Sequence, residues 1–525
     1  MERPEDTQSQ VIALLAEPAT HGLPGEERVT VHETHVSVVF LAGERAFKLK
    51  KAVKFPYLDF STLEARRQAC EDEVAINRRT APDLYLGLVP VAARPAGGLA
   101  VGGDGRPVEW LVEMRRFPGD GLFSQLAEAG GLGRRLMEEL ADRIAEFHAA
   151  AAVEPVFGGA AGTRMIIDNN DASFRSAAGQ ALFAPAEVDA LTEASRARRA
   201  RSAALLDARR AAGRVRHCHG DLHLANICLW QGRPTLFDAI EFNREFSRID
   251  VLYDLAFLLM DLDHRGFRRL AAIILNRYLD RAPADGPDLA GLALLPLFLS
   301  MRAAVRAHVG ASQAAGIKDA DKRRARGQEA RAYFDLAQTY LAPPQPVVVA
   351  VGGLSGSGKS RLAREIASYL GAAPGARIVR TDAMRKRLAG IDLFDRLAPE
   401  SYTPEASART YAACYAEARA ALAAGQAVVF DAVSAKPEER IAIEALAREA
   451  GAPFLGLWAT APLAVRLERV STRDSNVSDA GVEVAQRQED MDLGHMTWTE
   501  VDTSGRKKDS VARGLDALRA AHILR

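Results

Sequence analysis

The sequence predicts an α+β region with two lobes, followed by an α/β domain with a parallel sheet. A strand-rich segment over about 20–117 precedes a mostly helical lobe over about 118–340. The stretch "LAPPQP" (Leu341–Pro346) then places three prolines where a helix stops and a stiff spacer begins. Strand-like and helix-like segments alternate over 347–525, which is typical of a parallel sheet. We therefore expect domains over 1–340 and 347–525, joined by a linker at 341–346.

The N-terminal elements follow from local patterns. "HVSVVFL" and "AFKLKKAV" flank the turn "AGER", which predicts a hairpin within Val31–Val53. Residues 59–81 have a helical pattern, and residues 85–117 indicate two strands around a glycine-rich turn. The helical stretch from about 122 to 338 is interrupted by short strands around 217–242.

Composition limits the class of protein. The chain has 525 residues, with 68 Lys+Arg and 68 Asp+Glu, so no global charge attracts it to nucleic acid or to an anionic membrane. Its four cysteines are scattered, which indicates reduced thiols. The longest apolar stretch, Leu289–Met301, contains Pro296 and is shorter than a membrane span. The N-terminus lacks the basic region of a signal peptide, so we expect a cytoplasmic protein without membrane partners.

A phosphate-binding loop follows the predicted strand Val347–Val351. "GLSGSGKS" fits the pattern G-x-x-x-x-G-K-[ST] and opens a helical pattern, as this motif requires. Its glycines let backbone N–H groups face phosphate oxygens, its lysine reaches the β and γ phosphates, and its last serine binds Mg²⁺. The predicted nucleotide-binding residues are Gly353, Ser355, Gly356, Ser357, Gly358, Lys359 and Ser360.

Two acidic residues of this half are candidates for chemistry. In "GQAVVFDAV", Asp431 ends an apolar strand, where a carboxylate binds magnesium directly or through water; the alternative is an ordinary strand-end aspartate. In "RIVRTDAMRKRL", Asp382 lies near Arg380, Arg385 and Arg387, where it would act as general base for an acceptor hydroxyl. The alternative for Asp382 is a helix N-cap, and one residue can serve both purposes.

The segment "RLERVSTR" carries three arginines, Arg466, Arg469 and Arg473, that are either lid residues or solvated helix side chains. With the phosphate loop, "RTDAMRK" and "VVFDAV", it resembles the small P-loop kinases related to polynucleotide and gluconate kinases. The resemblance implies that Arg469 and Arg473 bind nucleotide and that Asp382 serves the acceptor hydroxyl.

The stretch "HCHGDLHLAN" suggests a second phosphate site. Asp221 precedes Asn226 by five residues, and Asp238 in "TLFDAIEF" follows twelve residues later. A kinase catalytic loop needs an aspartate facing the acceptor hydroxyl and an asparagine and a second aspartate around Mg²⁺. The nearby histidines and cysteines fit no zinc site, because alternating strand positions do not converge as tetrahedral ligands.

Here the chain resembles the aminoglycoside phosphotransferase and choline-kinase-like family, small-molecule kinases with the protein-kinase fold, over about 20–335. The resemblance implies that Asp221 is the catalytic base and that Asn226 and Asp238 bind the metal. It also implies that His219 structures the catalytic loop and that Asp254 braces it. Together the two resemblances indicate a phosphotransferase fused to an AAA-type, P-loop predicted kinase, as in the bifunctional aminoglycoside phosphotransferase/ATP-binding family.

The upstream nucleotide-binding parts are less specific. Lys48 in "RAFKLKK" is the predicted phosphate lysine, and Lys50 lies on the same face of the strand. Glu73 in "CEDEVAIN" is its predicted helix partner, with Glu71 as the alternative. "LVEMRRF" occupies the place of the adenine-binding hinge, but no G-x-G-x-x-G precedes Lys48.

These observations predict a bifunctional enzyme that uses ATP and Mg²⁺. Its N-terminal domain would phosphorylate a hydroxyl of a small metabolite, such as a sugar, amino sugar or related alcohol, and its P-loop domain would carry out a second phosphoryl transfer. One alternative is a nucleotide-sensing regulator with one inactive lobe. Another is a nucleic-acid end kinase in the C-terminal half, for which "SGRKKDS" is the only strong basic run. The acceptors and the oligomeric state do not follow from the sequence.

Overall fold

The computed structural model describes residues 4–34, 36–55, 58–95, 97–281, 286–472, 479 and 481–524. The chain divides into two compact units. The first combines Met1–Gly162 with Leu206–Leu258, and the second combines Thr163–Leu205 with Leu259–Arg525. The linker expected at 341–346 lies inside the second unit, and its role as a boundary between independent domains stays a prediction.

A six-stranded antiparallel sheet forms the β-rich part of the first unit, in the order β1-β2-β3-β8-β6-β7. The predicted hairpin is present, because β2 and β3 pair antiparallel around Gly43. The strands are β1 (Thr30–Glu33), β2 (Ser37–Ala42), β3 (Arg45–Lys50), β6 (Tyr85–Ala93), β7 (Leu99–Val101) and β8 (Arg106–Arg115). A separate short pair joins β4 (Lys54–Phe55) to β5 (Leu58–Asp59).

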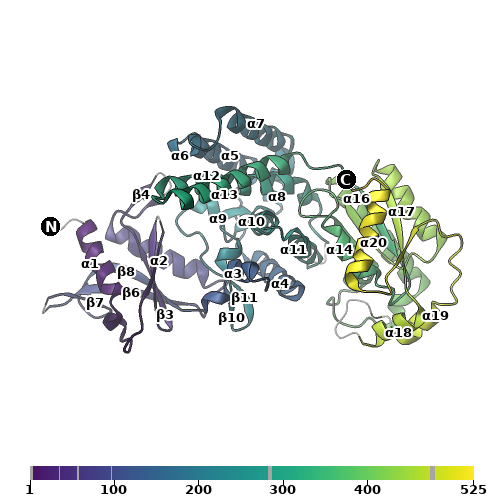
Figure 1. Cartoon of the computed structure of the whole chain (residues 1–525), viewed down its shortest axis with the longest axis horizontal. Helices are drawn as coiled ribbons and strands as arrows, with labels where there is room; N and C mark the ends of the chain where they lie inside the picture. The colour runs from purple at the N-terminus through teal and green to yellow at the C-terminus, as the bar shows by residue number, and fades with distance from the viewer. Residues whose placement is uncertain are drawn as a thin grey trace. The chain divides into compact units, whose positions relative to one another are not determined.

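Two helices cover the sheet (Figure 1). On α1 (Pro4–Ala16), Val11 and Leu15 are fully buried in one cluster with Phe40 of the sheet. On α2 (Leu63–Asn77), Val74 packs in a different cluster with Val112. Side chains of successive strand residues point to opposite faces, so each face of the sheet has its own apolar cluster. The cluster on one face packs α2 against β6 and β8.

The rest of the first unit supports the catalytic-loop sequence. Short strands β9 and β12 pair, as do β10 and β11, and the segment between β9 and β10 holds Asp221. These elements are η1 (Pro18–His21), η2 (Gly119–Gly121), α3 (Phe123–Glu128), α4 (Arg134–Ala150), α8 (Ala203–Ala211), β9 (Val215–His217), η3 (Leu224–Asn226), β10 (Ile227–Trp230), β11 (Arg233–Leu236), α9 (Arg244–Ser247), β12 (Arg248–Asp250) and α10 (Val251–His264).

The second unit begins with long helices. Among the described residues, one helical stretch, Ala290–Gly316, is long and apolar enough to cross a membrane, but 78% of its apolar window is buried inside the protein. Core packing therefore accounts for its apolar character. The helices are α5 (Gly159–Phe174), α6 (Ala177–Gln180), α7 (Pro185–Arg201), α11 (Arg268–Asp280), η4 (Ala290–Leu294), α12 (Leu295–Gly316) and α13 (Ala320–Leu341).

A five-stranded, fully parallel sheet follows, in the order β14-β15-β13-β16-β17, as the alternating pattern predicts. Its strands are β13 (Val348–Gly352), β14 (Arg377–Arg380), β15 (Val428–Asp431), β16 (Phe454–Thr460) and β17 (Thr499–Asp502). Its helices are α14 (Lys359–Ala367), α15 (Thr381–Leu388), η5 (Pro399–Tyr402), α16 (Pro404–Ala423), α17 (Pro437–Glu449), α18 (Leu463–Ser471), α19 (Val482–Arg487) and α20 (Lys507–Ala520).

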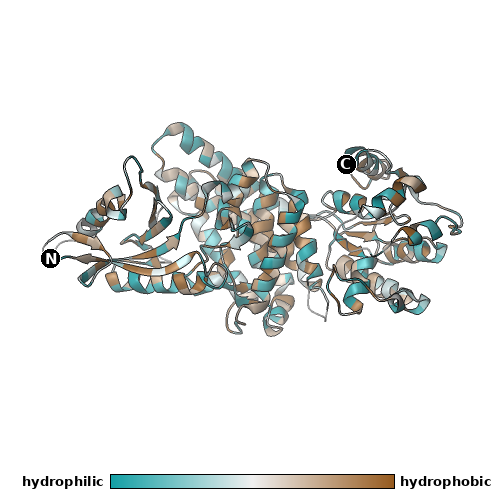
Figure 2. Cartoon of the chain, turned by 90° about the horizontal axis from the view of Figure 1, so that it is seen from below, coloured by the Kyte–Doolittle hydropathy of each residue, from teal (hydrophilic) through white to brown (hydrophobic). Residues whose placement is uncertain are grey.

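Both faces of this sheet are covered. One apolar cluster joins the sheet to α16 and α17, and the other joins it to α14 and α20. In Figure 2 brown strand segments lie between helices that alternate brown and teal. Burial on both faces explains the nearly continuous apolar run of β13. The carboxyl ends of the parallel strands consequently share one edge, where the phosphate loop begins.

Candidate functional site

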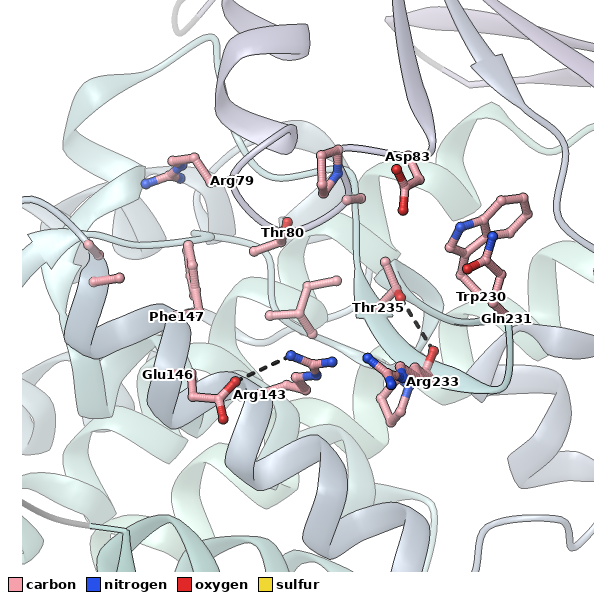
Figure 3. Close-up of a pocket in the computed structure, with 16 residues that line it drawn as sticks. Arg79, Thr80, Asp83, Arg143, Glu146, Phe147, Trp230, Gln231, Arg233 and Thr235 are labelled. Carbon is pink, nitrogen blue, oxygen red and sulfur yellow. Dashed lines mark hydrogen bonds and ion pairs between the residues drawn. The ribbon is translucent and has the colours of Figure 1, made fainter.

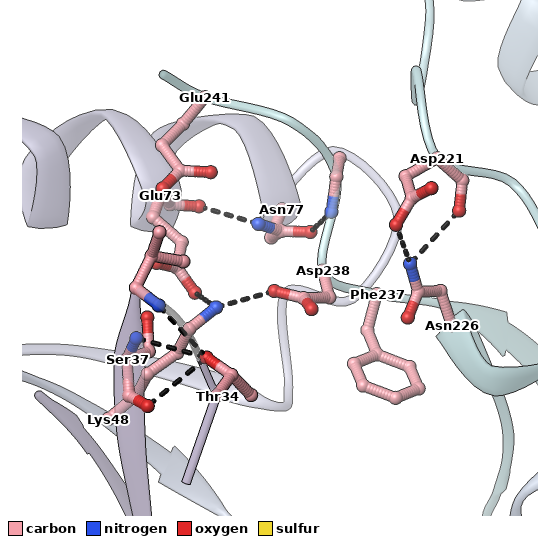
Figure 4. A network of polar contacts seen from close by, with 12 residues as sticks. Thr34, Ser37, Lys48, Glu73, Asn77, Asp221, Asn226, Phe237, Asp238 and Glu241 are labelled. Atoms are coloured by element: carbon pink, nitrogen blue, oxygen red, sulfur yellow. Dashed lines mark hydrogen bonds and ion pairs between the residues drawn. The ribbon is translucent and has the colours of Figure 1, made fainter. Parts of the chain in front are cut away.

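Lys48 of β3 reaches Glu73 of α2 (Figure 4). Lys50 of the same strand reaches the same glutamate. Lys48 Nζ lies 2.8 Å from Glu73 Oε1, and Lys50 Nζ lies 2.6 Å from Glu73 Oε2. Lys48 Nζ also lies 2.5 Å from Asp238 Oδ1, whereas Lys50 pairs with Glu241. Only Lys48 therefore joins Glu73 to a predicted metal ligand, which favours Lys48 as the phosphate lysine.

The two glutamates considered from the sequence have different surroundings. Glu73 is fully buried on the face of α2 that packs on the sheet. Glu71 has a side chain 41% exposed and pairs with Arg67 one turn earlier on the same helix. Glu73 is the partner of the lysines because it lies on the buried face.

The charged side chains of this cluster shift one another's pKa values. Burial alone would raise the pKa of Glu73, but Lys48 and Lys50 lower it to about 2. Burial also acts to lower the pKa of Lys48, yet Asp238 and Glu73 raise it well above its ordinary value. Lys48 therefore stays charged, as a phosphate-binding lysine must.

Asn77 and Tyr85 fix the segment that carries Asp238. Asn77 Oδ1 accepts a hydrogen bond from the Ala239 backbone N–H at 2.8 Å, and Tyr85 Oη accepts one from the Asp238 N–H at 3.1 Å. Asp238 itself has φ +61°, a conformation uncommon for a residue with a side chain. These contacts hold the carboxylate toward Lys48.

Asp221 and Asn226 lie against each other across the catalytic loop. Asn226 Nδ2 donates to the Asp221 carboxylate Oδ2 at 2.8 Å and to its backbone carbonyl at 2.9 Å. The side chain of Asp221 is 35% exposed, so an acceptor molecule can reach it. The structure thus brings Asp221 and Asn226 together, and their roles as catalytic base and metal ligand stay predictions.

His219 has a structural position beneath this loop. Its Nε2 lies 2.9 Å from the Phe237 carbonyl, and its Nδ1 accepts from the Asp221 N–H at 3.3 Å. Burial lowers the pKa of His219, which favours the neutral ring that this donor–acceptor pattern requires. His219 therefore links the Asp221 loop to the Asp238 segment.

Asp254 of α10 braces the same loop. Its carboxylate accepts from the backbone N–H groups of His219 and Gly220 at 3.1 and 2.8 Å, and it lies 3.1 Å from His148 Nε2. His148, Cys218 and Asp254 are close enough to resemble a metal site, but these hydrogen bonds already occupy both Asp254 oxygens. All four cysteines are buried, and none forms a disulfide.

The Asp238 region fits Mg²⁺. This ion prefers oxygen ligands, and Asp238 Oδ2 and Asn226 Oδ1 make no hydrogen bond within the described part of the chain. The predicted adenine-binding segment, Leu111–Phe117, runs through the end of β8, and the ring of Phe117 lies 5.1 Å from that of Phe237. Phe237 immediately precedes Asp238 in the chain.

The phosphate loop of the second unit connects β13 to α14. A Cβ on Gly356 would lie 2.5 Å from the Arg466 carbonyl, and φ of Gly356 is +83°, so this position requires glycine. The backbone N–H groups of Gly356, Gly358, Lys359 and Ser360 find no hydrogen-bond partner among the described residues. These donors at a helix N-terminus form an anion-binding cradle.

Not every loop donor is open. Ser355 N–H donates to Gln488 Oε1 at 2.7 Å, and Ser357 Oγ is buried without a hydrogen-bond partner in the described chain. Lys359 is largely buried, and its Nζ makes no hydrogen bond or ion pair to a described residue. The lysine is therefore available to a phosphate group.

Ser360 and Asp431 meet at the base of the loop. Ser360 Oγ lies 3.1 Å from Asp431 Oδ1. Burial raises the pKa of Asp431, while Lys359, Ser360 and Arg380 oppose that rise. A hydroxyl beside a buried carboxylate at a phosphate loop fits Mg²⁺, and the predicted binding of this ion by Ser360 and Asp431 stays a prediction.

The arginines near Asp382 have separate tasks. Arg385 donates to the Ser401 carbonyl at 2.6 Å, and Arg387 pairs with Glu417, so both side chains already have partners within the protein. Asp382 lies in the first turn of α15, whose N-cap is Arg380. Asp382 is therefore not the N-cap considered from the sequence, whereas its role as general base stays a prediction.

The three candidate lid arginines also differ. Arg469 donates to the Thr503 carbonyl at 2.6 Å and to the Gly356 carbonyl at 3.4 Å, so it lies against the phosphate loop. Arg466 is buried, and its Nη2 contacts the Ala485 carbonyl at 3.3 Å, which indicates a structural role. Arg473 lies outside the described residues.

A cavity of about 610 Å³ in the first unit lies among the end of α2, α4 and the β10–β11 hairpin (Figure 3). Its walls include Arg79, Phe147 and Trp230 but none of the predicted site residues. Arg79 donates to the backbone carbonyls of His217 and Cys218 at 2.6 and 3.2 Å, which anchors the strand before the catalytic loop.

Sequence reasoning missed three contributors to these sites. Glu241 completes the lysine cluster, Gln488 binds the phosphate loop, and Thr503 supports Arg469. Glu241 was detectable, because it follows Asp238 by three residues in an apolar context. Gln488 and Thr503 carry no local signal.

Comparisons with known proteins assign both halves. The family model described as "Phosphotransferase enzyme family" matches residues 53–295, and the model described as "AAA domain" matches 347–491. The uncharacterized proteins Rv2004c of Mycobacterium tuberculosis and Mb2027c of Mycobacterium bovis are each 29% identical over 516 residues, covering 95% of this chain and 97% of theirs.

Solved structures also show similarity. A choline/ethanolamine kinase family protein from Mesorhizobium loti is 16% identical, with 64% of this chain and 98% of that chain covered and a TM-score of 0.37. A gluconokinase from Sinorhizobium meliloti is 22% identical, with 34% and 94% covered and a TM-score of 0.25.

The two matched families imply ATP use and phosphoryl transfer, and the fold class predicted from the sequence is confirmed. The chain thus joins a region that matches the phosphotransferase enzyme family to a region that matches an AAA-type P-loop domain.

Proposed function

We propose that this protein is a bifunctional ATP-dependent kinase. Its phosphotransferase domain moves the γ-phosphoryl group of ATP to a hydroxyl of a small metabolite, and its P-loop domain performs a second phosphoryl transfer. The observation that carries the proposal is that Lys48 contacts both Glu73 and Asp238. Lys48 and Asp238 are 190 residues apart in the sequence. A lysine, an acid and a catalytic loop assembled from such distant segments are the parts that phosphoryl transfer needs.

In the phosphotransferase domain, each residue has a separable task. Lys48, held by Glu73, binds phosphate oxygens, and Asp221 accepts the proton of the acceptor hydroxyl. Asn226 holds the Asp221 carboxylate in place through the 2.8 Å hydrogen bond. Asp238 and Asn226 would hold Mg²⁺, which neutralises charge on the phosphates when bound.

In the P-loop domain, the open N–H groups and Lys359 bind the phosphates. Ser360 and Asp431 would hold a second Mg²⁺, which supplies the same charge neutralisation. Asp382 accepts the proton of the acceptor hydroxyl, and Arg469 stabilises the loop at its Gly356 carbonyl. This division of tasks gives each domain its own acceptor site.

The acceptors are small hydroxylated molecules such as a sugar, an amino sugar or a related alcohol. The equal numbers of acidic and basic residues, 68 each, give no reason to expect a nucleic acid or membrane partner. We infer the same cytoplasmic location that the sequence predicts.

A metabolite-library phosphorylation screen on the full chain tests this function, with Asp221→Asn and Lys359→Ala as single-site variants. Asp221→Asn should lower transfer to one set of acceptors by about 100-fold or more. Lys359→Ala should lower transfer to a different set by about 100-fold or more. If wild type and both variants bind Mg·ATP but transfer phosphate to no acceptor, the protein is a nucleotide-sensing regulator instead.

A further inference from the structure

The P-loop sheet has an edge strand, β14, that is covered by α11 rather than left open. Asn276 of α11 donates from Nδ2 to the Ala376 carbonyl at 3.0 Å and accepts at Oδ1 from the Ile378 N–H at 2.7 Å. These are the backbone groups through which an edge strand would pair with another strand. Helix α11 precedes the predicted linker in sequence, yet it belongs to the same compact unit as this sheet.

A buried ionic cluster lies at the end of the same contact. Asp280, the last residue of α11, places Oδ1 2.6 Å from Arg377 Nη2 and Oδ2 2.7 Å from Arg380 Nη2. Arg377 also binds Glu417 at 2.7 Å. Removing Asp280 would leave Arg377 with Glu417 alone and take from Arg380 its ion-pair partner, so Asp280 ties the two arginines together.

Arg380 lies next to the phosphate chemistry. It ends β14, and in the parallel register it is the residue opposite Asp431 on β15. Its side chain is 20% exposed, and Asp280 is its single hydrogen-bond partner among the described residues. A guanidinium has five N–H donors, so most of those on Arg380 remain available to an oxyanion.

We propose that Asp280 is a positioning residue for the P-loop site, which acts by holding Arg380 so that its open donors face the phosphoryl group being transferred. This inference rests on the proposed second phosphoryl transfer and adds to it. A helix encoded in the phosphotransferase half thereby becomes part of the P-loop active site. Arg377, Glu417 and Asn276 hold the helix against the edge strand.

The test uses the full chain carrying Asp221→Asn, so that the remaining ATP hydrolysis comes from the P-loop site. Asp280→Asn and Arg380→Ala should each lower kcat by roughly tenfold, because a displaced catalytic charge costs about that much or more. The double variant should be no slower than Arg380→Ala, since Asp280 acts only through Arg380. The Kd for Mg·ADP should change less than about twofold in all three, because ADP lacks the transferred group.

Glu365→Gln is the matched control. It removes another ion pair between α11 and the P-loop domain, Arg269–Glu365 at 3.3 Å, without touching Arg380, and should leave kcat unchanged. If Asp280→Asn unfolds the chain, Asp280→Glu takes its place, because it moves the carboxylate while keeping its charge. The two single variants and the double variant are then compared in the same way.

Three results would overturn the inference. These are losses that multiply in the double variant, a kcat for Asp280→Asn within twofold of the parent, and an equal loss in Glu365→Gln. Lys359→Ala in the same background separates this inference from the proposed function. If Lys359→Ala leaves hydrolysis unchanged, the second phosphoryl transfer itself is wrong; if only Lys359→Ala matters, the role of Asp280 is wrong.

Discussion

Replacing Glu73 by glutamine should both destabilise the protein and impair nucleotide use. Glu73 is fully buried between two lysine ammonium groups, at 2.8 and 2.6 Å. Glutamine has nearly the same shape, but it is neutral and offers only one oxygen to the two lysines. Lys48 and Lys50 would keep Asp238 and Glu241 as partners, but they would lose the one carboxylate that lies between them and pairs with both.

The magnitude follows from the burial of the pair. Breaking a buried ion pair by removing one partner costs about 3–5 kcal/mol, because the remaining charge loses its compensation. The amide retains part of the hydrogen bonding, and Asp238 and Glu241 still compensate the lysines. We therefore expect a loss of about 2–4 kcal/mol in the free energy of unfolding. Lys48 would also lose its orientation, so kcat/KM for ATP should fall by about 100-fold.

Glu71→Gln is the control on the same helix. Glu71 is 41% exposed and pairs with Arg67 at i,i+4 spacing, an interaction worth about 0.5 kcal/mol or less. Urea unfolding followed by circular dichroism gives the stability of each variant, and kinetics on an identified acceptor gives kcat/KM. Equal losses in the two variants, or a Glu73→Gln protein with normal stability and activity, would refute the reasoning from burial.

Three further outcomes are expected. Asp221→Asn should abolish transfer by the phosphotransferase domain while changing Mg·ATP affinity less than about threefold, whereas Asp238→Asn should weaken that affinity by about tenfold, and calorimetry distinguishes them. His308 is a pH-dependent group: burial lowers its pKa to about 4 from 6.5, so stability is full above pH 6.5 and falls by about 2 kcal/mol by pH 5. His308→Gln should remove this part of the pH dependence in unfolding experiments, and an unchanged slope would contradict it. Limited proteolysis should cut within 341–346, but isolated 347–525 should aggregate more readily than the full chain in light scattering, because β14 loses its cover; a monodisperse fragment would argue against this.

Local sequence patterns predicted the elements that hold the chemistry. The phosphate loop lies between a strand and a helix, and Asp431 ends a strand, because these positions depend on short-range pattern and on the parallel-sheet rule. Asp221 and Asn226 also meet, since five residues of loop fix their separation. Such features depend on neighbouring residues, so the sequence pattern can predict them.

Other features depended on burial and on distant contacts. Spacing alone could not decide between Glu73 and Glu71, because two residues on one helix differ only in the face they present to the sheet. Arg466 looked like a lid cation, but it is buried against α19. Asp280 and Arg377 are 97 residues apart in the sequence, and no local sequence pattern predicts a contact between residues so far apart.

The two candidate phosphate sites differ in whether their lysine is already paired with a carboxylate. In the phosphotransferase domain, Lys48 is already paired with Glu73 and Asp238. If Lys48 binds phosphate and Asp238 binds Mg²⁺ as we propose, the phosphate replaces Asp238 at Lys48 while the cation replaces Lys48 at Asp238. In the P-loop domain, Lys359 and several loop N–H groups have no partner among the described residues, and they are ready for phosphate without any exchange. On that proposal the first arrangement would couple nucleotide binding to metal binding, because neither partner of the Lys48–Asp238 pair should be left alone in a partly buried site. The second relies on fixed backbone donors, which lose little conformational entropy when the ligand arrives.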